Sequence, residues 1–466
     1  MKLKELKKRK IILGPQDCSP IQAFIKGNII TKLSAVFLGL GCFVHKQIGR
    51  GLLLLGLGCL YLYFMMQTGF HALTYMTTLG KVTTEQVFNE TTMMWENMQG
   101  DNSMILLLNL TLTLFATLGF LLVIAFSVKN AYVAQVFKAE GRHNPTFLED
   151  LASLKHQRVA GTFLAIPMLG VIMFTIIPIV YMIFIAFTNY DANHQPPGNL
   201  FTWVGLENFR NLFSWGGTLG NTFWPILGWT LIWAVTATAS NYIIGMIIAI
   251  IINRKGTRLK KMWRFFFVLT IAVPQFVTLL TMSQVFASEM YGHANVILRN
   301  LGLVEPGQFI PFLTDPMMAR ITVILVNIWI GVPFTILIVT GILQNIPQEL
   351  YEAAKMDGAN PIKLYTKITL PYMLFITTPY LITQFTGNVN NFNVIFLLTG
   401  GGPMTLDFYQ GGRTDLLITW LFRLSMTSRD FNIASVVGVI IFIIMATVSI
   451  LTFRQTAAFK DEGGFQ

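Results

Sequence analysis

The stretch GTFLAIPMLGVIMFTIIPIVYMIFIAF, from Gly161 to Phe187, runs for 27 residues without an Asp, Glu, Lys or Arg. A helix needs roughly 20 apolar residues to cross the hydrocarbon core of a bilayer, so this stretch predicts a membrane span. The whole chain agrees, because 53% of its 466 residues are hydrophobic and only 12% are charged. Soluble domains carry about 25% charged residues. The sequence therefore indicates an all-α polytopic membrane protein.

Seven other apolar stretches are long enough to span, which predicts about eight transmembrane helices. The eight lie approximately at 50–69, 104–128, 161–187, 222–252, 265–287, 321–343, 372–398 and 433–453. A ninth candidate, 29–44, is only about 16 residues long and contains Lys32, so it is expected to be interfacial or re-entrant rather than spanning.

The distribution of positive charge orients these helices. With both termini in the cytoplasm, 26 of the 33 Lys and Arg residues fall in cytoplasmic segments and 7 lie outside. Membrane proteins keep Lys and Arg on the cytoplasmic side, so the split supports this orientation and explains the net charge of +11 without nucleic acid. The predicted parts are a basic cytoplasmic segment (1–49), two N-terminal helices with a short external loop (50–128), a cytoplasmic linker (129–160), a six-helix core (161–453) and a cytoplasmic tail (454–466).

Several kinds of chemistry are not indicated. The predicted spans hold no charged residue, which weakens a proton-coupled mechanism but leaves sodium coupling through neutral oxygens open. The three cysteines, Cys18, Cys42 and Cys59, form no C-x-x-C pair, and no histidines have metal-ligand spacing, so no metal site is expected. No G-x-x-x-x-G-K-[ST] motif occurs, so any ATP must be hydrolysed by another chain. No catalytic residues are predicted.

The cytoplasmic loop between the sixth and seventh predicted spans is the most informative segment. It reads PQELYEAAKMDGANP at 347–361 and ITLP at 368–371. Pro347 suits the first turn of a helix, and Gly358 allows a tight turn before Pro361 starts a second helix. These residues predict a short helix–turn–helix that projects into the cytoplasm.

The spacing of this loop resembles the EAA signature of binding-protein-dependent ABC importer permeases. The matching positions are Glu352, Ala353, Ala354, Gly358, Ile368, Leu370 and Pro371. In that family the loop is a coupling helix that sits in a groove of the ATPase subunit. The resemblance implies that Glu352 is the key polar contact with the ATPase and that the small residues allow close packing. Alternatively, Glu352 only stabilises the N-terminal end of its helix, by about 0.3–1 kcal/mol.

The resemblance extends from about 158 to 455, where the chain looks like the six-helix core of maltose-type sugar permeases. Supporting pieces are 187–190, 204–209 and 398–403. The two preceding spans resemble the larger permease subunit of maltose and maltodextrin importers, although the short 70–103 loop departs from versions that carry a large external domain. The implied function is import of maltodextrin-like or other oligosaccharides across the plasma membrane of a prokaryote.

The same resemblance implies specific partners. They are a second permease subunit, two ABC ATPase subunits that use ATP and Mg, and an extracytoplasmic solute-binding protein. This chain is then a non-catalytic permease that binds no cofactor. A secondary sugar transporter or another polytopic channel component is the alternative, which the complete motif weighs against.

A sugar site is expected on the seventh predicted span. Gln384, Asn388 and Asn391 follow i, i+4, i+7 spacing, which places them on one helical face. In maltose-type permeases this helix lines the sugar site, and asparagines at the places of Asn388 and Asn391 contact the sugar. In those permeases a phenylalanine that stacks on the sugar would fall at the place of Gly387, so this sequence departs from their pattern. Phe385 and Phe392 are the nearby aromatic residues. Alternatively, the amides bond neighbouring helices.

Overall fold

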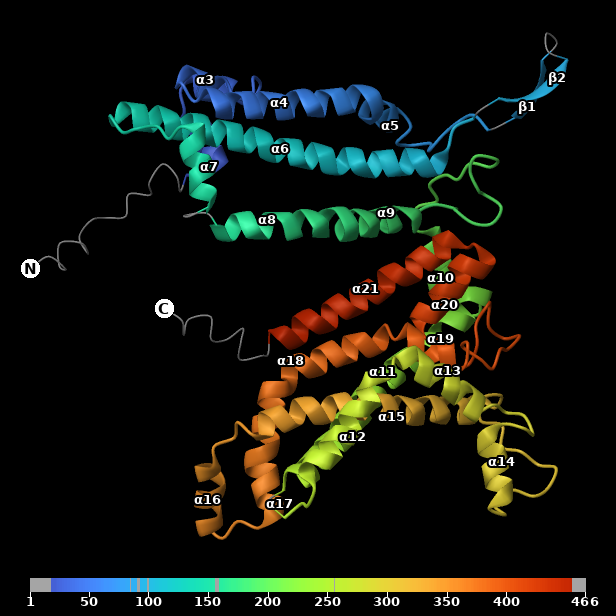
Figure 1. The fold of residues 1–466 in the computed structure, drawn as a ribbon. Coiled ribbons are helices and arrows are strands. Elements are labelled where there is room, and N and C mark those ends of the chain that lie inside the picture. The colour runs from blue at the N-terminus through green and yellow to red at the C-terminus, as the bar shows by residue number, and fades with distance from the viewer. Residues whose placement is uncertain are drawn as a thin grey trace, which may run out of the picture. The chain divides into compact units, whose positions relative to one another are not determined.

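The computed structural model describes residues 18–83, 85–89, 93–98, 100–155, 159–254 and 256–454. They divide into two compact units. The first comprises the described residues up to Phe184 together with Asn193–Trp203, and the second comprises Ile185–Ala192 together with the described residues from Val204 onward. Most of the described chain is helical, as predicted (Figure 1).

The first unit is built on two long apolar helices. One runs through α4 (Ile48–Phe64), a π-helical turn (Met65–Gly69) and α5 (Phe70–Thr74), and the other is α6 (Ser103–Ala139). The Tyr61 ring stacks on Phe120 at 3.9 Å between centroids, and its hydroxyl lies 3.1 Å from Thr117 Oγ1. These contacts hold α4 along α6, side by side in Figure 1.

The candidate segment at 29–44 does not form one helix. After α1 (Pro20–Lys26) it forms α2 (Ile29–Leu33) and α3 (Leu40–Val44), and both pack on α6. The break falls at Gly39, whose φ is +79° and whose N–H donates to Ser127 Oγ at 3.1 Å. Helices of five residues are too short to cross a bilayer, which agrees with a non-spanning segment.

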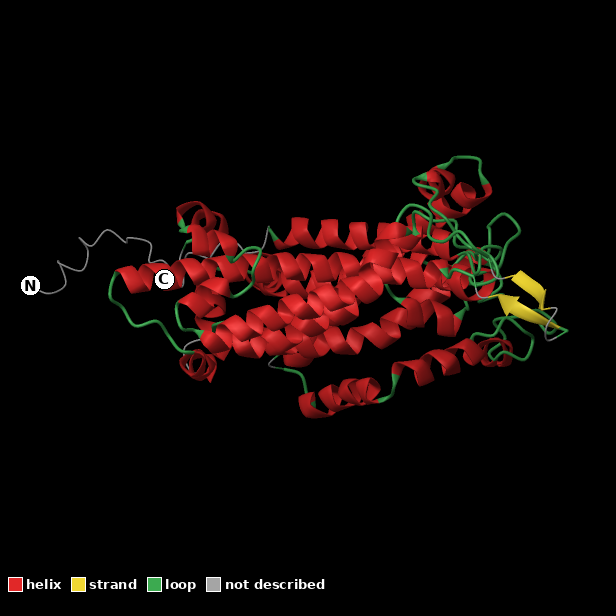
Figure 2. Cartoon of the chain, turned by 90° about the horizontal axis from the view of Figure 1, so that it is seen from above, coloured by secondary structure: helices red, strands yellow, loops and turns green. Residues whose placement is uncertain are grey.

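The external loop at 70–103 contains a feature that the all-α prediction missed. β1 (Glu85–Asn89) pairs antiparallel with β2 (Met94–Met98), with Phe88 opposite Trp95. The hairpin is the yellow element of Figure 2. The rest of this unit consists of α7 (Phe147–Lys155), α8 (Val159–Val171), a π-helical turn (Ile172–Ile176) and α9 (Ile177–Ile185).

The second unit is organised around α11 (Thr218–Asn253) and α15 (Pro316–Leu343), which lie side by side. Small residues permit this approach, because a Cβ on Gly245 would sit 2.6 Å from Thr335 Cβ. Nearer the cytoplasmic end, Asn253 Nδ2 donates to Thr340 Oγ1 at 3.0 Å. The remaining helices before the coupling loop are α10 (Glu207–Phe213), α12 (Lys260–Ala272), α13 (Gln275–Val285) and α14 (His293–Asn300).

The predicted count of eight spans is not confirmed. Six helices in the described chain are long and apolar enough to cross a membrane, or up to seven if one bent pair counts as a span. The six are Ile48–Thr74, Ser103–Ala139, Val159–Ile185, Thr218–Asn253, Pro316–Leu343 and Phe431–Phe453.

The two remaining predicted spans are interrupted. The span predicted at 265–287 is α12 and α13, which meet at an angle of 89° where Pro274 precedes α13. Pro removes a backbone donor and disfavours helical geometry in the residue before it. The span predicted at 372–398 is α18 (Leu370–Val389) followed by α19 (Phe392–Leu398), and α18 is less apolar because it carries several Thr, Pro, Gln and Asn residues.

The segment after α19 is folded around a buried carboxylate. Asp415 is fully buried and accepts hydrogen bonds from Gly412 N–H at 2.7 Å and Thr419 Oγ1 at 2.8 Å. Arg423, the last residue of α20 (Leu417–Arg423), lies 3.4 Å from the carboxylate. Burial raises the pKa of Asp415, and Arg423 opposes that rise. A π-helical turn (Leu424–Ser428) and α21 (Phe431–Phe453) complete the unit.

Candidate functional site

The loop that the charge distribution predicts to be cytoplasmic forms the expected helix–turn–helix, α16 (Gln348–Met356) and α17 (Pro361–Leu364), visible at one end of the second unit in Figure 1. Gly358 has φ +75°, and the Ala359 N–H donates to the Ala354 carbonyl at 2.9 Å to close α16. The Asn360 side chain then caps α17 by accepting from Lys363 N–H at 2.8 Å. A Cβ at Gly358 would meet nothing within 4 Å, so there is space for a side chain. The turn favours glycine here because of its positive φ, which other residues adopt only with strain.

The motif residues are available at the surface of this loop. Glu352 and Ala353 are exposed, and Ala354 is half-buried. Large apolar side chains surround them: Met356 is 89% exposed and Ile362 is 71% exposed. Exposed apolar groups of this size on a polar loop are typical of a protein contact surface.

The inner side of α16 borders a cleft of about 490 Å³. Glu352 lies on its wall together with the cations Arg254 and Lys355. The other lining residues come from α11 and the residue stretch after it, the end of α15, α16 itself, α17 and the segment that leads into α18: Ile250, Asn253, Gly256, Leu343, Gln348, Tyr351, Pro361, Leu364, Tyr365 and Thr369.

The loop is attached directly to the helix that follows it. A π-helical turn (Tyr365–Thr369) connects α17 to α18, and Leu370 and Pro371 of the motif form the first residues of α18. The hydroxyl of Tyr351 on α16 lies 2.9 Å from Thr369 Oγ1. This contact and the continuous chain therefore connect α16 with the start of α18.

At the other end of α18, two of the predicted amides come together. Asn388 is buried, and its Nδ2 donates to Thr238 Oγ1 on α11 at 2.9 Å. Its backbone carbonyl accepts from Trp233 Nε1 at 3.1 Å. Asn391 Nδ2 lies 3.4 Å from Asn388 Oδ1, which makes the pair a small polar group between apolar helices.

The prediction that Gln384, Asn388 and Asn391 share one helical face is wrong for Asn391. Because α18 ends at Val389, Asn391 lies beyond it and acts as the N-cap of α19, where its Oδ1 accepts from Val394 N–H at 3.3 Å. Gln384 is half-buried and makes no side-chain hydrogen bond within the described residues. The alternative role, bonding a neighbouring helix, is observed for Asn388.

A cavity of about 830 Å³ runs along α18, and none of the three predicted amides is among its lining residues. Phe385 and Tyr242 contribute aromatic surfaces to it, and Thr238, which accepts from Asn388, also lines it. Phe392 instead stacks on Phe396 at 4.7 Å in an aromatic cluster. Of the two aromatics near Gly387, Phe385 is therefore the one that faces the cavity. Its remaining lining is mostly aliphatic: Val235, Ala239, Ile243, Met246, Tyr365, Leu370, Leu374, Thr378, Leu381, Ile382, Val448 and Thr452.

Two further amides are buried between α11 and α15. Asn241 Oδ1 and Asn327 Nδ2 are buried without a hydrogen-bond partner in the described chain. A Cβ on Gly331, one turn from Asn327, would collide with the Asn241 amide. In the sequence, each Asn stands out as a polar residue in an apolar run. That Asn241 and Asn327 lie near each other follows only from how α11 packs on α15.

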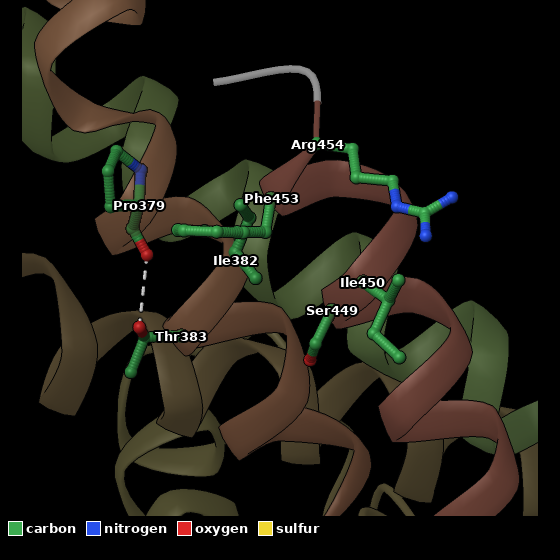
Figure 3. Close-up of a pocket in the computed structure, with 7 residues that line it drawn as sticks. All are labelled: Pro379, Ile382, Thr383, Ser449, Ile450, Phe453 and Arg454. Carbon is green, nitrogen blue, oxygen red and sulfur yellow. Dashed lines mark hydrogen bonds between the residues drawn. The ribbon is translucent and has the colours of Figure 1, made fainter. Parts of the chain in front are cut away.

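A separate groove of about 550 Å³ lies between α18 and α21 (Figure 3). Its walls are apolar apart from Thr383, Ser449 and Arg454, and the Thr383 hydroxyl donates to the Pro379 carbonyl at 3.0 Å. It includes none of the predicted site residues. Among the described residues, no group of three or more His, Cys, Asp or Glu side chains could hold a metal ion.

Comparison with known proteins identifies the family. The family described as "Binding-protein-dependent transport system inner membrane component" matches residues 241–460, which include the loop. The chain is also 34% identical over 436 residues to the maltodextrin transport system permease protein MdxF of Bacillus subtilis (strain 168), covering 92% of this chain and 96% of MdxF. The chain belongs to the binding-protein-dependent ABC transport permeases.

A second relative has a different named substrate. The permease is 33% identical over 451 residues to the galactooligosaccharides transport system permease protein GanP of Bacillus subtilis (strain 168), covering 93% of this chain and 99% of GanP. Its fold resembles a chain of the bacterial alginate ABC transporter, with TM-score 0.53, 20% identity, and coverage of 65% of the permease and 94% of that chain. Family membership favours an importer permease over a secondary transporter or a channel component.

Proposed function

We propose that this permease forms part of the translocation path of an ATP-driven importer for oligosaccharides of the maltodextrin type. The observation that carries the proposal is the continuity from an exposed coupling loop to a buried amide pair through a single helix, α18. The two similar permeases named for maltodextrin and galactooligosaccharides support a substrate of several sugar units.

The coupling loop is the proposed contact with an ABC ATPase subunit. Glu352 supplies a charged contact, Ala353 and Ala354 permit close approach, and Met356 and Ile362 provide exposed apolar surface. A partner that closes on ATP pushes α16, and the Tyr351–Thr369 contact transmits that movement to α18. The helix thus moves between two packings that nucleotide binding biases.

The sugar site is proposed around the amides at the end of α18, which reach the cavity through Thr238. Sugar hydroxyls need neutral hydrogen-bonding partners, which Gln384, Asn388 and Asn391 offer, and sugar ring faces pack on aromatic surfaces such as Phe385. Gln384 has an uncommitted amide for this role, whereas Asn388 must share its amide with Thr238. Asn241 and Asn327 add two buried polar atoms that need a partner.

In this proposal the chain is not itself an enzyme and binds no cofactor. Two ABC ATPase subunits use ATP and Mg, a second permease subunit completes the path, and an extracytoplasmic solute-binding protein delivers the sugar. Both termini lie in the cytoplasm of a prokaryotic cell, as the charge distribution supports.

Reconstitution tests the proposal. The permease is co-purified with its partner permease and ATPase subunits and placed in proteoliposomes with the solute-binding protein. ATP hydrolysis that rises with maltodextrin-loaded binding protein, together with sugar accumulation, is the expected result. Unliganded binding protein is the control. Sugar uptake driven by an ion gradient without any ATPase subunit would overturn the proposal in favour of a secondary transporter.

A further inference from the structure

The connection from α11 to α12 carries an unusual concentration of positive charge. Residues 254–264, RKGTRLKKMWR, contain six Lys and Arg residues and no Asp or Glu. The coupling loop at 347–371, by contrast, balances three Lys residues with Glu349, Glu352 and Asp357. The excess at 254–264 is therefore a local property and does not characterise every cytoplasmic connection.

Two of these cations are already used within the fold. Lys260 Nζ donates to the Asn253 carbonyl at 3.2 Å, and Arg264 donates to Asn253 Oδ1. Both stabilise the carbonyl end of α11. Arg258 and Lys261 are exposed, and neither makes an ion pair or a side-chain hydrogen bond within the described chain. They remain available to a partner.

α12 has two different faces. Lys260, Arg264 and Phe267 lie on a partly buried face with i, i+4, i+7 spacing, which packs on α11 and α15. The opposite face exposes large apolar side chains, among them Phe265, Phe266 and Leu269, and Trp263 is exposed at the edge between the two faces. Trp is enriched at the level of lipid headgroups, and the place of Trp263 three residues after Lys260 supports a membrane boundary near the first turn of α12.

The location of this turn is also defined. Arg254 and Gly256 line the same cleft as Tyr351 and Glu352, so the start of α12 lies at the same end of this unit as α16 and α17 (Figure 1). That end is the cytoplasmic one in the proposed orientation. The cytoplasmic leaflet carries anionic lipids, and clusters of Lys and Arg beside a membrane helix attract them.

We propose that the first turn of α12 is a binding site for an anionic phospholipid of the cytoplasmic leaflet. Arg258, just before α12, and Lys261 contact the phosphate group, and the acyl chains lie along the exposed face that begins at Phe265, one turn after Lys261. A phospholipid matches both halves of this surface, because a negative headgroup meets the cations and its chains meet the adjacent aromatic face. This site is additional to the proposed transport function and does not depend on which sugar is carried.

Native mass spectrometry of the whole importer complex tests the site, with phosphatidylglycerol and phosphatidylcholine as alternative probes. Wild-type complex is compared with Arg258→Gln/Lys261→Gln and with the charge-conserving Arg258→Lys/Lys261→Arg. A matched control, Lys26→Gln/Lys32→Gln, removes two exposed cations from α1 and α2. Removing each headgroup contact should weaken phosphatidylglycerol binding about fivefold.

The expected result is that only the neutralised α12 variant loses bound phosphatidylglycerol, and that phosphatidylcholine occupancy does not change. Equal loss in the Lys26/Lys32 variant would show a general effect of charge and overturn the proposal. Displacement of the lipid by inorganic phosphate alone would show an anion site without lipid selectivity. Dissociation of ATPase subunits with lipid retained would assign this surface to a protein partner instead.

Discussion

The hydroxyl groups of Tyr351 and Thr369 lie 2.9 Å apart and join α16, the proposed coupling helix, to the segment that continues into α18. Nineteen residues further along the chain, Asn388 of the same α18 donates to Thr238 at 2.9 Å. α18 joins these two contacts, although Pro379 lies inside it and interrupts its backbone hydrogen bonds. The two proposed sites are therefore parts of one mechanical element.

Replacing Glu352 tests the ATPase contact. Glu352→Lys should reduce binding-protein-stimulated ATP hydrolysis by more than about tenfold, because reversing an interfacial charge costs about 2 kcal/mol or more. Glu352→Gln should have a smaller effect, and Glu349→Gln, which changes a neighbouring carboxylate outside the motif, serves as the matched control. Full stimulated activity in Glu352→Lys would contradict a coupling role for this residue.

The Tyr351–Thr369 contact is expected to act as a pair. Tyr351→Phe and Thr369→Val should each lower the stimulated ATPase rate about fivefold, which corresponds to the loss of about 1 kcal/mol of hydrogen bonding. The double variant should be no worse than either single variant, since both remove the same interaction. Independent, multiplying effects in this double-mutant cycle would show that the hydroxyl groups do not work together.

Gly358 tests a backbone requirement in the turn after α16. Because its φ is +75° and a Cβ would meet nothing, Gly358→Ala should destabilise the loop by about 1 kcal/mol through strain alone. Gly358→Asn should be milder, since Asn tolerates left-handed geometry. Hydrogen exchange of the α16 amides measures the effect. Equal protection in all three proteins would contradict the assigned geometry.

The amides at the end of α18 separate two roles. If Asn388 contacts sugar, Asn388→Leu should abolish uptake, whereas Thr238→Val should leave a free amide and change apparent affinity by less than about fivefold. If Asn388 only fastens α18 to α11, both variants should impair uptake equally. Gln384→Leu should raise the sugar concentration needed for half-maximal uptake without affecting stability, because its amide has no internal partner in the described chain.

Asp415 should make stability depend on pH. Burial raises the pKa of its carboxyl above the ordinary value of 3.8, so the folded state favours the protonated acid. Its contribution is full below the ordinary pKa and is lost as pH rises through the raised value. The measurement is the thermal midpoint of the wild type minus that of Asp415→Asn. This difference should decrease as the pH rises from 3.8 through the raised pKa of Asp415. Arg423→Gln should steepen the fall, because Arg423 is the main group opposing the rise.

A flat difference between wild type and Asp415→Asn would show that the Asp415 pKa is the same in the folded and unfolded chains. Arg423→Gln should also lower stability at neutral pH by about 3–5 kcal/mol, because it leaves a buried carboxylate without its cation. Arg413→Gln, whose partner Asp407 is mostly exposed, is the control and should cost less than about 1 kcal/mol.

Local sequence determined which segments are helical and which loop projects from the membrane. A run such as 161–187 is apolar along its whole length, and the condition for spanning is a sum over consecutive residues. The turn of the coupling loop is equally local, since Gly358, Asn360 and Pro361 each act within a few residues. The loop motif also indicated the family without knowledge of any contact.

Tertiary structure decided what happens where helices meet. Pro274 was visible, but the 89° angle between α12 and α13 depends on what each half packs against. Asn391 fell on the expected face by spacing, yet α18 ends at Val389 and Asn391 reaches Asn388 from the next helix. Thr238 and Asn388 are 150 residues apart, and periodicity carries no information at that separation. A contact between residues so far apart in the sequence forms only when the two helices pack against each other, and the packing of α18 on α11 depends on the whole helix bundle.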